Sequence, residues 1–199
     1  GLRLLRDAEQ RLHVVSDLVG TQYSFWPNSL ARILARQGLS VEQIDETVVR
    51  YKATRTDAEM LAFVKEQEGG QGAPGRDLMS WEEIREMQAS GLVRFGSHTR
   101  RHTRLSAISE GEALQDEIIG SQEVIERQLG ARPRTFCYPN GDTSAQAVEL
   151  VRGGYLGAVT TQGGWHTPQG DPFLIRRMGV HEDISSRPAS FLARISGWL

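Results

Sequence analysis

The sequence predicts an α/β fold in which helices alternate with short parallel strands. From about residue 77 to the C-terminus, short apolar segments recur between segments with helical periodicity. Helix-capping residues and glycines mark where those helices begin and end. Helical connections of this length join neighbouring parallel strands in a sheet or barrel. A chain of 199 residues, 39% of them hydrophobic, can bury one good core and carry an additional helical region.

The chain up to about residue 68 is expected to be mostly helical. Asn28 is typical of the N-cap of a first helix, and the apolar run over residues 12–18 is a candidate strand. Two further helices are predicted by capping boxes, which pair Ser40 with Gln43 and Thr56 with Glu59. The glycine-rich segment 69–75 is the clearest boundary. We therefore expect a helical insert or N-terminal region over 1–70 and a βα domain over 77–199.

The elements expected in the βα domain alternate along the chain. Strands are predicted at 92–95, 135–138, 156–161 and 174–180. Helices are predicted at 80–91, at 109–129 and around 147–154, ending at glycines. In such folds the loops at the carboxyl ends of the strands carry the chemistry. The turn that contains Asn140 and the loop that contains His98 and His102 both follow predicted strands.

His98 and His102 follow the second predicted strand and are separated by three polar residues. Neutral imidazole is the commonest metal ligand among side chains, and two imidazoles at this spacing can converge on one divalent ion. Gly96 and Ser97 favour a tight turn before the pair. A bare histidine pair is also common in loops that bind nothing, so this alternative stays open.

Composition excludes several classes of protein. The formal net charge of −2 gives no electrostatic reason to expect a nucleic-acid partner. No apolar run approaches the roughly 20 residues that a membrane-spanning helix needs. Cys137 is the only cysteine, so no internal disulfide forms, and its position in a strand favours a small core residue over a nucleophile.

Over about residues 77–198 the sequence resembles the polysaccharide deacetylases of carbohydrate esterase family 4. The segment from His98 to His102 resembles the family's metal motif, His-Ser/Thr-x-x-His. The segment 134–141, Arg-Thr-Phe-Cys-Tyr-Pro-Asn-Gly, resembles its third motif, Arg-x-Phe-Arg-x-Pro-Tyr-Gly. The segments 158–161 and 175–180 are similar to a bacterial branch of the family.

The resemblance implies an incomplete or distorted (β/α) barrel of the deacetylase type that removes acetyl groups, N-linked or O-linked, from a polysaccharide. It implies a divalent ion, zinc first, held by His98, His102 and an aspartate, with a second aspartate as general base. The backbone N–H of Asn140 would stabilise the oxyanion. His181 is the candidate general acid. Location in the cell envelope or outside the cell is implied by the resemblance alone.

Three residues are expected to contact the substrate. Tyr138 and Pro139 lie in the segment that resembles the third motif. Trp165 lies in a glycine-rich loop after a predicted strand, where an indole can stack on a sugar ring, although such a residue is as often a packing residue.

The sequence departs from the family pattern in two places. The first motif, Thr-Phe-Asp-Asp-Gly, which supplies the base and the third metal ligand, does not occur upstream of His98. We expect that the chain lacks the N-terminal part of a longer deacetylase; alternatively, Asp17 stands in as a metal ligand. Cys137 replaces the arginine that orients the base.

These departures keep a second function open, a catalytically inactive deacetylase-like domain that binds glycan or serves as a scaffold. An incomplete barrel would also leave strand edges exposed, so self-association into a homo-oligomer is expected.

Overall fold

The computed structural model describes residues 10–69, 76–180 and 187–197. The chain divides into two compact units: residues 20–80 form a helical unit, and residues 1–19 together with 81–199 form a unit built on a sheet. This division differs from the predicted boundaries at 70 and 77, because the strand β1 (Gln10–Val14) joins the sheet of the second unit. The helical unit is thus inserted in sequence between β1 and the rest of that sheet.

The helical unit consists of α2 (Trp26–Arg36), α3 (Val41–Thr54) and α4 (Asp57–Gln67). Its core is apolar and consists of Trp26, Leu30, Ile33, Met60 and Val64. The capping boxes predicted for α3 and α4 are both confirmed. The prediction of Asn28 as N-cap was wrong: α2 begins at Trp26 after Phe25, because Pro27 fits the first turn, where its missing N–H has no intrahelical acceptor to bond.

The second unit contains a parallel four-stranded sheet with the order β1-β2-β3-β4. The strands after β1 are β2 (Val93–Ser97), β3 (Thr135–Cys137) and β4 (Gly157–Val159). The candidate strand at residues 12–18 is confirmed for its first part by β1. Because all strands are parallel, their carboxyl ends lie along one edge of the sheet.

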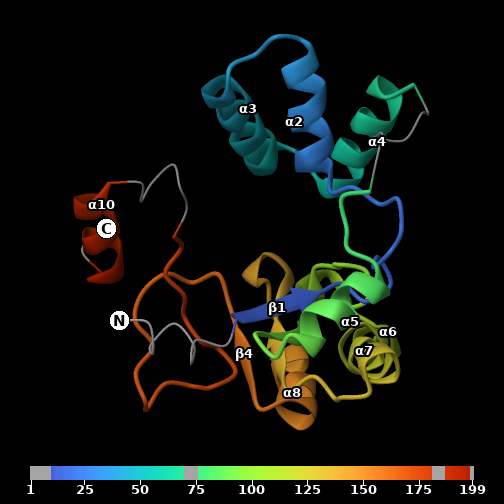
Figure 1. Cartoon of the computed structure of the whole chain (residues 1–199), viewed down its shortest axis with the longest axis vertical. Helices are drawn as coiled ribbons and strands as arrows, with labels where there is room; N and C mark the ends of the chain where they lie inside the picture. The colour runs from blue at the N-terminus through green and yellow to red at the C-terminus, as the bar shows by residue number, and fades with distance from the viewer. Residues whose placement is uncertain (1–9, 70–75, 181–186, 198–199) are drawn as a thin grey trace. The chain divides into compact units, whose positions relative to one another are not determined.

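Helices connect the strands of the sheet (Figure 1). They are α5 (Trp81–Ala89), α6 (Gly111–Gln115), the π-helical turn η2 (Asp116–Gly120), α7 (Ser121–Leu129) and α8 (Ala145–Gly154). Two short 3₁₀ turns, η1 (Leu105–Ala107) and η3 (Pro139–Gly141), lie in the loops after β2 and β3. The helix α10 (Pro188–Ile195) lies near the C-terminus and has no buried residue.

The main core joins β3 and β4 to α6, η2 and α8. It consists of buried side chains from those elements, from η1 and from the residues directly after β3 and α8: Leu105, Leu114, Ile118, Phe136, Tyr138, Ala147, Val151, Tyr155 and Ala158. The rings of Tyr138 and Tyr155 both lie 5.2 Å from the ring of Phe136. This packing fixes β3 and therefore the turn that follows it.

Two predicted elements differ in the structure. The long helix expected over 109–129 begins at Gly111 and is interrupted by the π turn η2. The strand expected over 174–180 was wrong, because only Ile175 forms a bridge, to Val159 at the end of β4. Beyond that bridge, the N–H of Arg177 bonds to the carbonyl of Gln162 in the loop, outside any strand.

The architecture is a mixed helix and parallel-sheet fold, consistent with a partial, distorted α/β barrel. Among the residues that the structure describes, β1 has a strand neighbour on one side only. None of the described helices combines the length and the apolar character needed to cross a membrane.

We predict that Phe136→Ala lowers the free energy of unfolding by roughly 3–5 kcal/mol, because the fully buried ring leaves a cavity between β3 and α8. Urea unfolding followed by circular dichroism measures it. The matched control is Leu156→Ala, which removes a side chain that is 62% exposed beside β4, and its effect is expected within about 0.5 kcal/mol. Equal unfolding midpoints for the two variants would contradict the assigned core.

Candidate metal and oxyanion site

The loops after β1 and β2 are joined by backbone hydrogen bonds at the carboxyl edge of the sheet. The N–H of His98 donates to the carbonyl of Val14 at 2.9 Å, and the N–H of Ser16 donates to the carbonyl of Thr99 at 3.1 Å. The N–H of Asp17 donates to the carbonyl of Arg100 at 3.0 Å. Backbone hydrogen bonds of the kind found between paired strands therefore connect the histidine loop to the loop after β1.

The two predicted histidines lie together. Their ring centroids are 4.9 Å apart, with an interplanar angle of 76°. The Nδ1 atom of His98 lies 2.6 Å from the backbone carbonyl oxygen of Cys137, the last residue of β3. A carbonyl oxygen only accepts, so Nδ1 carries the proton and the neutral ring keeps the lone pair of Nε2 for another partner. A hydrogen bond of this kind orients metal-binding histidines.

An unusual backbone conformation brings the rings together. Thr99 and His102 have φ angles of 65° and 64°, in the left-handed region that a β-branched residue such as threonine rarely adopts. The side chain of Thr99 is fully buried, and its hydroxyl accepts the N–H of His102 at 3.0 Å. This bond closes the loop between the two imidazoles.

Gly96 was expected to favour a tight turn before the histidines, but in the structure it has a different role. It lies within β2 opposite His13 of β1, and a Cβ atom there would lie 2.4 Å from the Cδ2 atom of His13. The glycine therefore makes room for the half-buried imidazole of His13. Burial lowers the pKa of His13 to about 4, and its Nε2 atom has no hydrogen-bond partner among the described residues.

Asp17, the candidate third ligand, lies in an ion pair. Both of its carboxylate oxygens accept from the Nε atom of Arg100, at 3.0 and 2.9 Å. Within the described residues no three histidine, cysteine, aspartate or glutamate side chains are grouped so that they could hold a metal ion. The structure brings His98 and His102 together but does not add Asp17 to them.

The turn after β3 presents a backbone donor. Asn140 is exposed, with a φ angle of 55°, and its N–H has no acceptor among the described residues. Its carbonyl accepts from the hydroxyl of Thr161 at 3.1 Å. Gly141 has a φ angle of 72° and packs on Thr161 so closely that a Cβ atom would lie 2.0 Å from the Thr161 hydroxyl oxygen. The orientation of the Asn140 N–H is therefore fixed on both sides.

Tyr138 and Pro139, expected to contact the substrate, are both buried. The Tyr138 side chain is fully inaccessible, and its ring packs on Phe136 in the core. The buried side chains anchor the Asn140 turn, and contact of either residue with a substrate stays a prediction. Cys137 is buried as well, and this burial raises the pKa of its thiol, in keeping with a core residue.

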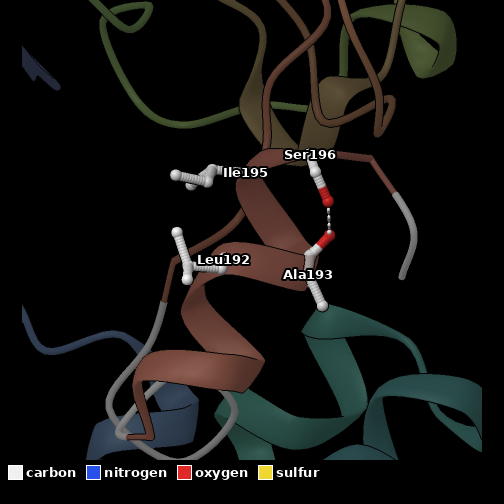
Figure 2. A pocket seen from close by; sticks show the side chains of 4 residues that line it. All are labelled: Leu192, Ala193, Ile195 and Ser196. Atoms are coloured by element: carbon white, nitrogen blue, oxygen red, sulfur yellow. Dashed lines mark hydrogen bonds between the residues drawn. The ribbon is translucent and has the colours of Figure 1, made fainter.

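Trp165 is 66% exposed in the loop after β4, and its indole N–H donates to the carbonyl of Ser196 at 3.4 Å. A shallow hollow beside it on α10 is lined by Leu192, Ala193, Ile195 and Ser196 (Figure 2). The hollow has no titratable side chain, so it offers no chemistry. His181, the candidate general acid, lies outside the described residues.

Sequence reasoning missed Glu117, whose buried carboxylate bonds to the loop between the histidines. The sequence did contain a pattern that points to this residue. Glu117 stands three residues after Leu114 and four before Ser121, so it falls on the inward face of a helix, where a charged side chain requires a partner.

We predict that the metal-free protein loses stability on acidification between pH 6.5 and about 4. Burial lowers the pKa of both His98 and His13 from 6.5 to about 4, so in this window the unfolded chain binds protons that the folded chain does not. The free energy of unfolding therefore falls as the pH falls. Urea unfolding across this range, in the presence of a chelator, measures the slope.

The control for this prediction is His13→Gln, which removes one of the two titrating groups. The free energy of unfolding is then expected to change less steeply with pH, because up to one proton fewer is taken up on unfolding. An NMR titration in which the ring protons of His98 shift with a midpoint near 6.5 would contradict the prediction.

Comparison of the sequence with known proteins identifies one family. The sequence model of the polysaccharide deacetylase family matches residues 43–154, more than half of the chain. No curated protein matches the sequence.

Solved structures of deacetylases share the fold. The putative polysaccharide deacetylase BA0330 from Bacillus anthracis is 17% identical with a TM-score of 0.54, over 94% of this chain and 67% of that one. The deacetylase PplD from Streptococcus pyogenes is 15% identical with a TM-score of 0.54, over 85% of each chain. IcaB from Ammonifex degensii is 24% identical with a TM-score of 0.49, over 61% of this chain.

The chain spans about half the length of some relatives: 53% of IcaB and 51% of the deacetylase domain of BpsB from Bordetella bronchiseptica. The family match covers the histidine loop, the π turn and the Asn140 turn together. The resemblance seen in the sequence is thus confirmed, and the chain belongs to the polysaccharide deacetylase family.

Proposed function

We propose that this chain provides the histidine ligands and the oxyanion donor of an enzyme that hydrolyses acetyl groups from a polysaccharide. The observation that carries the proposal is the His98–His102 pair at the carboxyl edge of the sheet, with the His98 ring held through Nδ1. Family membership supports the reaction class, and the site supports the roles.

The histidines suit a divalent ion, with zinc as the first choice. Imidazole nitrogen is a ligand that zinc prefers, and such an ion, when bound, polarises a carbonyl and lowers the pKa of a water molecule. The fit is partial, because a catalytic zinc site has three protein ligands and the described residues supply two. We propose that the third ligand and the general base are carboxylates outside the described residues.

The Asn140 turn has the properties of an oxyanion donor. A donor stabilises a developing negative charge best when it is already oriented and has no competing acceptor. The N–H of Asn140 meets both conditions, because Thr161 and Gly141 fix the turn and no described residue accepts the N–H. The buried Tyr138 and Pro139 hold the turn from inside.

Trp165 is the proposed platform for a sugar ring. Its indole is exposed, and its N–H is oriented by Ser196, which leaves an aromatic face for the apolar face of a sugar. His181 remains a proposed general acid. Whether the acetyl group is N-linked or O-linked follows from the substrate and not from these residues.

A second function is favoured by one observation: Asp17 is engaged by Arg100, and the described residues group no three side chains that could hold a metal ion. A deacetylase-like domain without a complete ligand set would bind glycan or serve as a scaffold. It predicts saccharide binding with no acetate release, even in excess zinc.

We predict that His98→Ala and His102→Ala each lower acetate release from acetylated oligosaccharide by about a hundredfold or more, because each removes a ligand of the ion that activates water. The assay uses the longest protein that contains this chain, with zinc supplied and bound zinc measured in parallel. The matched control is Glu123→Gln, an exposed carboxylate on α7, which is expected to leave both values unchanged.

Each outcome of this assay separates the two functions. Acetate release that persists in His98→Ala would contradict the catalytic role of the pair. Saccharide binding without release in the unaltered protein would favour the non-catalytic domain.

A further inference from the structure

Glu117 is a buried carboxylate that bonds to the histidine loop. Its side chain is 4% exposed and lies in the π turn η2. One oxygen, Oε2, accepts the backbone N–H groups of both Arg100 and Arg101, each at 3.0 Å. These two N–H groups belong to the residues between Thr99 and His102, where the backbone takes its left-handed conformations.

The other oxygen of Glu117 is used as well. Oε1 accepts from the Nη1 atom of Arg101 at 2.8 Å and from the hydroxyl of Thr103 at 3.2 Å. All four hydrogen bonds of this carboxylate therefore go to the segment 100–103, and the guanidinium of Arg101 balances its charge. Among the residues that the structure describes, no other segment bonds to this carboxylate.

The backbone geometry of the loop requires an anion at this point. Successive N–H groups that converge after a left-handed residue form a concave site for a negative charge. The carboxylate of Glu117 fills that site, and its charge strengthens each bond. Without it, the N–H groups of Arg100 and Arg101 would face a buried position with no acceptor, which costs more than the bonds themselves contribute.

The π turn delivers the carboxylate to this place. A π turn widens the helix by one residue and is frequent at functional sites. Directly after it, the hydroxyl of Ser121 donates to the carbonyl of Thr99 at 3.0 Å and lies 2.6 Å from the hydroxyl of Ser97. The same helical segment thus holds the loop at the residue before the first histidine and at the residues between the two.

We infer that Glu117 is a positioning residue of the candidate site: its carboxylate fixes the segment 100–103 and thereby the mutual orientation of His98 and His102. It does not touch a substrate or a metal ion. The consequence for catalysis rests on the proposed function, but the positioning itself does not.

The test compares Glu117→Ala and Glu117→Gln with the matched control Glu123→Gln. Two measurements need neither metal nor substrate: hydrogen exchange of the Arg100 and Arg101 amides, and the ¹⁵N chemical shifts of the two imidazoles. Glutamine keeps one acceptor oxygen but loses the charge and the second acceptor, so it is expected to show an intermediate effect.

In Glu117→Ala we expect these two amides to exchange at least about tenfold faster, since each loses a charge-assisted bond, and the imidazole shifts of both histidines to move. Acetate release is expected to show a kcat lowered by about 10–100-fold with KM nearly unchanged. If the alanine variant does not fold, the same comparison is made with Glu117→Gln.

Unchanged exchange and unchanged imidazole shifts in a folded variant would overturn the positioning role. Failure of the proposed function is recognised separately. In that case His98→Ala would keep its acetate release, while the changes in amide exchange and imidazole shifts of the Glu117 variants would remain.

Discussion

The hydrogen bond from Nδ1 of His98 to the backbone carbonyl of Cys137 is the interaction on which the candidate site depends. It crosses from the loop after β2 to the end of β3, so it forms only when these strands are in register, with Ser97 opposite Phe136. Phe136 is fully buried between two tyrosine rings, which fixes that register. The packing of the core therefore determines which nitrogen of His98 keeps its lone pair. In this way apolar side chains fix the geometry of the candidate site.

The parallel sheet then places the remaining parts of the site on one edge. The segments after all four strands meet there, and each is tied to the next: Ser16 to Thr99, His98 to Cys137, and Thr161 to Asn140. Loops are usually the most mobile parts of a fold, and function requires that their polar groups be held. Here hydrogen bonds from both backbone and side-chain donors continue between these segments beyond the point where the strand pairing ends.

Short sequence patterns predicted the features of the fold that depend on residues close together in the sequence. The capping boxes at Ser40 and Thr56 satisfy backbone donors within one turn, so the sequence located α3 and α4 correctly. The spacing of His98 and His102 after a strand located the histidine pair. The π turn, the left-handed Thr99 and the close approach of His13 to Gly96 depend on contacts between segments distant in sequence, and no short pattern encodes them.

Asp17 shows how a residue of the right chemistry can serve another purpose. Its carboxylate already accepts two bonds from Arg100, and a metal ion could recruit it only by breaking an ion pair that also holds the loop. Glu117 bonds to the same loop from the helical side. Both carboxylates thus hold the segment between the histidines: Asp17, after β1, through the side chain of Arg100, and Glu117, in η2, through the backbone N–H groups of Arg100 and Arg101. Because Asp17 is engaged in that way, we propose that it supports the histidine loop and that the third ligand of the proposed site lies among residues beyond those described.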